Sequence, residues 1–147
     1  MVANNMAQLD AMLIKEMQKA LRVVADKALA DMYEETADFY TGGEPIPAEE
    51  GGYVRTGALG DTPRTTAVET NGKSASFTAY LDTNHIYTTG KNPPMLDVLN
   101  LANDGVNDSS VGWLRDVVGK EGFWDRAEDK IKEDFESTFF QFFNLRY

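Results

Sequence analysis

The feature that most constrains the fold is a long segment whose apolar side chains recur along a single stripe. Between Asn5 and Tyr40, apolar side chains recur at intervals of three and four residues: Met6, Leu9, Leu13, Met17, Leu21, Val24, Ala28 and Met32. This spacing predicts one amphipathic helix, and Asn4 or Asn5 can cap its start. At ~1.5 Å per residue the helix is roughly 50 Å long, so its stripe needs a cover. That cover is either the chain's own core or another copy of the chain, and both alternatives remain open.

A break and then a strand pattern follow the helix. Four glycines and two prolines between Thr41 and Gly52 exclude regular structure there, which predicts an exposed loop. Arg64–Glu69 is rich in β-branched residues, and Asn71-Gly72 predicts a type I′ hairpin turn. Apolar and polar residues then alternate over Lys73–Thr83, which predicts a strand with one packed face and one wet face. A third short strand over Asn84–Tyr87 is a further option.

The remaining chain predicts two helices. Pro93 and Pro94 suit the first turn of a helix over Met95–Asn103, which Asn103-Asp104-Gly105 ends. Val111–Val118 is ambiguous between strand and helix. A last helix over Phe123–Leu145 has a stripe made of Trp124, Ala127, Ile131, Phe135, Phe139 and Phe142.

These elements predict an α+β fold in a single domain of 147 residues. It comprises a long N-terminal amphipathic helix (1–40), a flexible loop (41–52), a unit with a small antiparallel sheet (53–122), and a C-terminal amphipathic helix packed on that sheet (123–147).

Charge and composition make some classes of function unexpected for this chain. The formal net charge is −10, so the surface repels DNA and anionic membranes, and direct nucleic-acid or membrane binding is not expected. Acidity can simply maintain solubility, or it can provide a channel wall to which DNA does not adhere. With no cysteine, disulfides, thiol catalysis and Cys-based metal sites are excluded. Neither a membrane span nor a signal peptide is expected.

The sequence offers little catalytic chemistry. His85 is the only histidine, and it follows Asp82 and Asn84. Since no serine lies in a nucleophile elbow, a hydrolase is the weakest hypothesis. The Asx-rich segment Asn103–Asp108 fails the calcium-loop register, because Val111 would stand where a bidentate Glu is needed. We therefore expect no catalytic residue, no cofactor and no metal.

The last helix has two faces that suit a partner. Its acidic face carries like-charged residues four apart, such as Asp125 with Asp129, and these repel one another unless a basic partner or solvent screens them. Its phenylalanines are too widely distributed for one stripe, so part of the cluster would be exposed in a monomer. Self-association is the simplest expectation for that cluster.

The stretch Tyr53–Asp61, Tyr-Val-Arg-Thr-Gly-Ala-Leu-Gly-Asp, resembles the x-x-Thr-Gly-x-Leu-(Arg/Gly)-x-Ser signature of the small tail-completion, or head–tail joining, proteins of long-tailed bacteriophages. The order of long helix, motif, hairpin and final helix is also similar, and Gly122–Ala127 looks like that family's Pro-Phe-Leu-x-Pro-Ala motif. Here Asp61-Thr62-Pro63 replaces the family's Ser-Ile, and both prolines of the second motif are missing.

The resemblance implies a structural virion protein rather than an enzyme. Such proteins form a homo-oligomeric ring at the head–tail junction or the tail end and dock neighbouring neck and tail proteins. The candidate assembly residues in this sequence are Arg55, Thr56, Gly57, Leu59, Tyr80, Trp113, Phe140, Phe143 and Tyr147. Thr56 is expected to cap a short helical turn, with Leu59 facing inward. The alternative of a different class is an acidic inhibitor that mimics nucleic acid.

Overall fold

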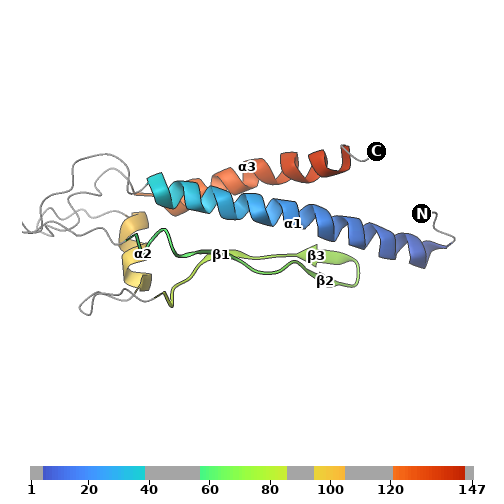
Figure 1. Ribbon diagram of the computed structural model, residues 1–147, viewed down its shortest axis with the longest axis horizontal. Helices are drawn as coiled ribbons and strands as arrows, with labels where there is room; N and C mark the ends of the chain where they lie inside the picture. Colours follow the sequence, from blue (N-terminus) through green and yellow to red (C-terminus); the bar gives the residue numbers. More distant parts are fainter. Residues whose placement is uncertain (1–4, 39–56, 86–94, 105–120, 145–147) are drawn as a thin grey trace, which may run out of the picture. The chain divides into compact units, whose positions relative to one another are not determined.

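The computed structural model describes residues 5–38, 57–85, 95–104 and 121–144. The elements, in chain order, are α1 (Met6–Asp38), β1 (Pro63–Thr65), β2 (Glu69–Asn71), β3 (Ser74–Ser76), β4 (Ala79–Leu81), α2 (Met95–Asp104) and α3 (Phe123–Asn144) (Figure 1). The predicted α+β fold is confirmed. The predicted loop at 41–52 and the ambiguous segment 111–118 lie outside the described residues.

Helix α1 has the predicted extent and the predicted cap. The Asn5 side-chain oxygen accepts a hydrogen bond from the Gln8 backbone N–H at 2.9 Å. This is the N-cap interaction that satisfies one of the free N–H groups of a first helical turn.

The stripe of α1 is covered along only part of its length. From Ala20 to Met32 the stripe is buried, and Val24, Ala28 and Met32 are each at most 2% exposed. Towards the N-terminus the same stripe is open, with Met6 71% and Leu13 51% exposed. The second half of the helix therefore packs into the protein's own core, and its first turns do not. Cover by another copy of the chain stays a prediction.

The strands form two antiparallel pairs, β1 with β4 and β2 with β3. The register of β2–β3 pairs Asn71 with Ser74, so the two turn residues are Gly72 and Lys73. Only Gly72 among them has a positive φ, +60°, which suits a type II′ turn with glycine at its first central position. The predicted type I′ turn is therefore wrong, because Asn71 continues the strand and keeps a negative φ.

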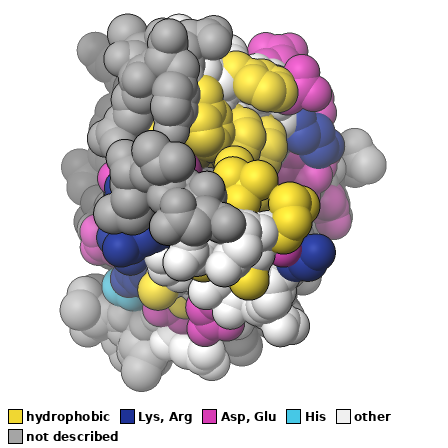
Figure 2. All heavy atoms as spheres, turned by 90° about the vertical axis from the view of Figure 1, so that its right-hand side faces the viewer, with side chains coloured by type: hydrophobic (Ala, Val, Ile, Leu, Met, Phe, Trp, Pro, Cys, Tyr) yellow, Lys and Arg dark blue, Asp and Glu magenta, His cyan; other side chains and the backbone are white. Residues whose placement is uncertain are grey.

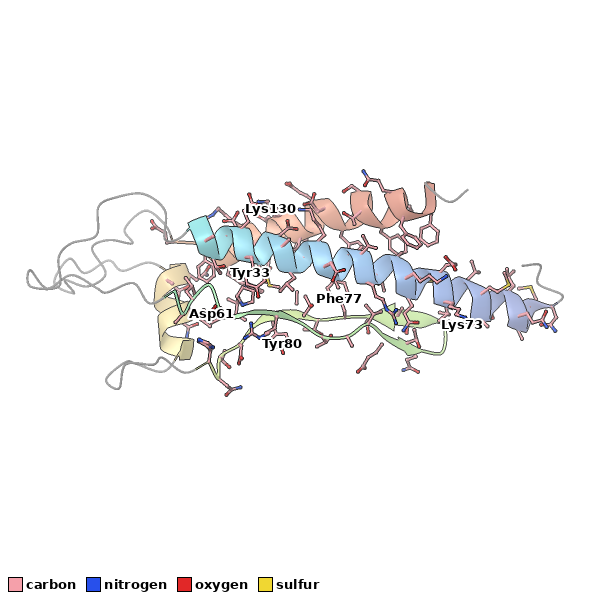
Figure 3. All side chains as sticks on the ribbon, viewed as in Figure 1. Tyr33, Asp61, Lys73, Phe77, Tyr80 and Lys130 are labelled. Carbon is pink, nitrogen blue, oxygen red and sulfur yellow. The ribbon has the colours of Figure 1, made fainter. Side chains whose placement is uncertain are left out.

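The alternation predicted over Lys73–Thr83, the segment that contains β3 and β4, is confirmed. Ala75, Phe77, Ala79 and Leu81 are half-buried, whereas Ser74, Ser76, Thr78 and Tyr80 are exposed. Phe77 and Tyr80, labelled in Figure 3, therefore lie on opposite faces. The third strand is not formed in the described part of Asn84–Tyr87, because His85 closes a turn by donating its N–H to the Asp82 carbonyl at 3.3 Å.

The chain forms two compact units, and both long helices contribute to each. The first unit contains most of α1, the β2–β3 hairpin and most of α3. Within it, α3 and the hairpin lie alongside α1 (Figure 1), and the Lys73 ammonium is 3.3 Å from the Asp10 carboxylate. The second unit contains the end of α1, the turn before β1, α2 and the start of α3. The single-domain organisation stays a prediction.

The positive φ of Gly72 gives a measurable prediction. Gly72→Ala is expected to lower the free energy of unfolding by about 1 kcal/mol, because a Cβ disfavours this backbone conformation although no atom lies within 4 Å of it. Gly72→Asn is the matched control, since asparagine tolerates positive φ better, and it should cost less. Urea denaturation measures both. Equal losses for the two variants would contradict this assignment of the turn.

Candidate interaction surfaces

The motif Thr56-Gly57-Ala58-Leu59 leads into a tight turn, of which the structure describes the residues from Gly57 onward. The Asp61 and Thr62 N–H groups donate to the carbonyls three residues earlier, at 3.2 and 3.1 Å. The Thr62 hydroxyl donates to the Leu59 carbonyl at 2.7 Å. Leu59 is 1% exposed, so the expectation that it faces inward is confirmed.

The turn packs into the core of the second unit. Ala58 and Leu59 contact Leu99 and Ala102 of α2 and Phe123 at the start of α3, with Leu81 and Trp124 packed against this cluster. Three segments far apart in sequence thus share one apolar core. A substitution in the turn therefore acts on the whole second unit, and Leu59 influences any surface only through the fold.

Asn103 connects the end of α2 to the start of α3. Its side-chain oxygen accepts a hydrogen bond from the Trp124 N–H at 3.0 Å, and its backbone carbonyl accepts from the Gly122 N–H at 2.6 Å. Trp124 lies in the first turn of α3, where N–H groups lack helical partners. Asn103 thus caps a helix that begins twenty residues further along the chain.

Arg126 fixes the end of α1 to the start of α3. Its Nε is 2.9 Å from a Glu35 carboxylate oxygen, and its guanidinium also donates to the Glu121 carbonyl at 2.7 Å. Glu35 is less exposed than Arg126, 13% against 43% by side chain. One arginine therefore joins α1, the segment before α3, and α3 itself.

A second ionic contact between the same helices lies in the first unit. The Lys27 ammonium contacts both Asp31 on α1 and Asp134 on α3, the latter at 2.7 Å. Asp31 is 1% exposed, and one of its carboxylate oxygens has no hydrogen-bond partner in the structure. A carboxylate in such a place is tolerated only with a cation beside it. The hydrogen bonds to Asp134 and then Asp31 raise the pKa of Lys27 above its ordinary value.

The direction of that shift fixes a pH dependence. A lysine whose pKa is raised by folding contributes stability that is fully present below its ordinary pKa of about 10.4 and is lost as pH rises through the folded value. We expect the difference in unfolding free energy between the wild type and Lys27→Met to stay constant between about pH 8 and pH 10. Urea denaturation across that range checks this, and a difference that shrinks below pH 10 would contradict it.

Five phenylalanines, called here the phenylalanine cluster, surround the last turns of α3: Phe135, Phe139, Phe140, Phe142 and Phe143. Phe139 contacts Phe135 with ring centroids 6.0 Å apart, Phe143 at 5.1 Å and Phe140 at 5.8 Å. No member is fully buried, and Phe140 is 58% exposed. The prediction that part of the cluster is exposed in a single copy is confirmed.

The open first turns of α1 form a second apolar surface in the same unit, made of Met6, Leu9 and Leu13 and called here the α1 apolar end. Figure 2 views the side of the molecule where α1 begins and α3 ends. It shows apolar side chains gathered there, bordered by acidic and basic ones. Exposed apolar side chains gathered on one side of a protein are typical of a binding site.

Asp82 and His85, the pair on which a hydrolase would depend, lie in one turn, where the His85 backbone N–H donates to the Asp82 carbonyl at 3.3 Å. The Asp82 Oδ1 atom accepts the Asn84 N–H at 3.0 Å, which makes Asp82 a turn-forming residue. Among the described residues, no group of three or more His, Asp or Glu side chains is arranged to hold a metal ion.

The candidate assembly residues fall into four groups. Arg55, Thr56, Trp113 and Tyr147 lie outside the described residues. Gly57 and Tyr80 are exposed, with Gly57 at a φ of +76°, while Phe140 and the half-buried Phe143 belong to the phenylalanine cluster. Leu59 alone is buried in the core. The structure brings Phe140 and Phe143 together and places Gly57 beside Leu59 in the turn.

Among the interactions that the sequence did not predict are the contact of Lys27 with Asp31 and the capping of α3 by Asn103. Asp31 lies on the same face of α1 as Ala28 and Met32, and an acidic residue on an apolar stripe four residues after a lysine was the signal for the Lys27 contact. The capping role of Asn103 had no local signal, because its partner Trp124 is distant in sequence.

In the described part of the chain, no helix is long and apolar enough to cross a membrane. Comparisons of the chain with protein-family models, curated proteins and solved structures found no match in any of the three.

Proposed function

We propose that this chain is a structural virion protein of a tailed phage or prophage, which forms a homo-oligomeric ring at the head–tail junction or tail end. In this role it docks neighbouring neck and tail proteins, needs no cofactor and performs no catalysis. The observation that carries the proposal is the Tyr53–Asp61 motif, followed by a hairpin and a final amphipathic helix in the order of the tail-completion proteins that it resembles.

Two physical features support the same role. The phenylalanine cluster and the α1 apolar end leave one unit with apolar surface that water does not solvate well, which suits a protein that functions with neighbours. The net charge of −10 suits a component beside a DNA passage, because it repels the phosphate backbone.

The proposal is tested by locating the protein in particles. Phage particles are produced with an epitope-tagged version of this chain and purified on a density gradient. They are then analysed by immunoblotting and immunogold electron microscopy. We expect the tag at one end of the tail or at the neck, in several copies per particle. A chain that stays with the soluble lysate while intact particles lack it would overturn the proposal.

A further inference from the structure

The outer faces of α1 and α3 carry complementary patterns. Both lie in the first unit. On α1, Leu9, Met12, Lys15, Lys19 and Val23 fall within a single arc of the helix surface, beside the stripe that packs inward. Leu9 and Val23 are 39% and 44% exposed, and the Lys19 side chain is 42% exposed.

On α3 the outer face comprises Glu133, Glu136, Phe140 and Phe143, at intervals of three and four residues. The two glutamates and Phe140 are exposed and Phe143 is half-buried. From Ser137 to Asn144 the helix has no charged residue, so the acidic part and the aromatic part of this face are separate.

The order of these parts sets how two such faces can meet. Along α1 the apolar residues Leu9 and Met12 come first and the lysines follow. Along α3 the glutamates come first and the phenylalanines follow. An antiparallel arrangement therefore places Phe140 on Leu9 and Met12, and the carboxylates beside Lys15 and Lys19. Met–aromatic contacts and opposite charges both favour this arrangement.

The outer face of α1 is positively charged, although the protein as a whole is acidic. Glu16, its acidic member, is already in contact with Lys19 at 2.5 Å, so the two lysines leave the face positive. Anionic lipid and nucleic acid are poor occupants for either face, since the whole chain carries −10. A second copy of the chain supplies a matching acidic and aromatic face.

We propose that the outer face of α1 in one copy binds the outer face of α3 in the next copy, in an antiparallel head-to-tail contact. The two faces differ, so each copy keeps one free face after the contact forms. Such a heterologous interface continues from copy to copy and closes into a ring when the rotation permits. The contact itself stands on the described residues, and only its closure into a ring rests on the proposed function.

Charge exchange tests the contact in the full-length chain. Sedimentation velocity measures self-association of the wild type, of Lys15→Glu/Lys19→Glu, of Glu133→Lys/Glu136→Lys and of the variant with all four changes. Each double variant should associate roughly 100-fold more weakly. The fourfold variant, and an equimolar mixture of the two doubles, should recover association. Lys73→Glu, at a side chain 85% exposed on the hairpin, is the control and should associate like the wild type.

Phe140→Asp provides a measurement that does not depend on the charge changes. This side chain is 58% exposed, so the variant should keep the wild-type circular dichroism spectrum and lose association. A monomeric wild type, unchanged association of either double variant or of Phe140→Asp, or a fourfold variant that fails to recover would each overturn the contact. If the chain is found in phage particles but the substitutions do not change its self-association, the contact is refuted and the proposed function stands. If the chain associates through these faces but is absent from phage particles, the proposed function is refuted and the contact stands.

Discussion

Leu59→Asp is expected to unfold the second unit. The Leu59 side chain is 1% exposed and packs with Ala58, Leu99, Ala102 and Phe123, so a carboxylate there has no water and no cation. Burying an unpaired charge and losing the leucine contacts together should cost more than about 4 kcal/mol. This is a large part of the roughly 5–15 kcal/mol that stabilises a typical domain.

Tryptophan fluorescence and circular dichroism during urea denaturation measure this loss, because Trp124 packs against the same cluster. Tyr33→Asp is the matched control, since Tyr33 belongs to the same unit but is 43% exposed. It should cost about 1 kcal/mol or less. A Leu59→Asp chain that unfolds at the wild-type urea concentration would show that the turn is not part of this core.

Lys27→Met is expected to destabilise the first unit by about 3 kcal/mol. Methionine keeps most of the side-chain volume but removes the cation, which leaves Asp31 as a buried carboxylate without its described partner. Removing one member of a buried ion pair is costly for this reason, whereas replacing both members by apolar groups is often neutral. The free energy of unfolding from urea denaturation measures the loss.

The double variant Lys27→Met/Asp31→Leu separates the two explanations for such a loss. If the uncompensated carboxylate is the cause, the second substitution should restore most of the stability. Lys19→Met is the control, because its partner Glu16 lies at a more exposed site, and it should cost about 0.5 kcal/mol. A double variant as unstable as Lys27→Met would mean that lost packing around Lys27 dominates.

Helical and strand periodicity was sufficient to predict most of the described elements. The stripe of α1, the alternation around Phe77 and the extent of α3 all follow from the interval at which apolar residues recur. Those patterns depend on a few neighbouring residues, so they are visible in a sequence. Asn5 could be assigned as a cap for the same reason, since its partner Gln8 is three residues away.

The turn type and the long-range contacts depend on information that local patterns lack. Asn71-Gly72 permits two hairpin registers, and the pairing of Asn71 with Ser74 selects the one that makes Gly72 the first turn residue. Which part of the α1 stripe is covered depends on where α3 lies. For the candidate surfaces, periodicity indicated the excess of phenylalanines but not which of them are exposed, because that requires the partner helix.

The contact of Asn103 with Gly122 has a consequence for engineering. Asn103 accepts hydrogen bonds from the Gly122 N–H at 2.6 Å and from the Trp124 N–H at 3.0 Å, so the end of α2 and the start of α3 both depend on this one residue. A substitution at position 103 therefore disturbs two helix ends at once. A stabilised variant of this chain should accordingly keep the asparagine there.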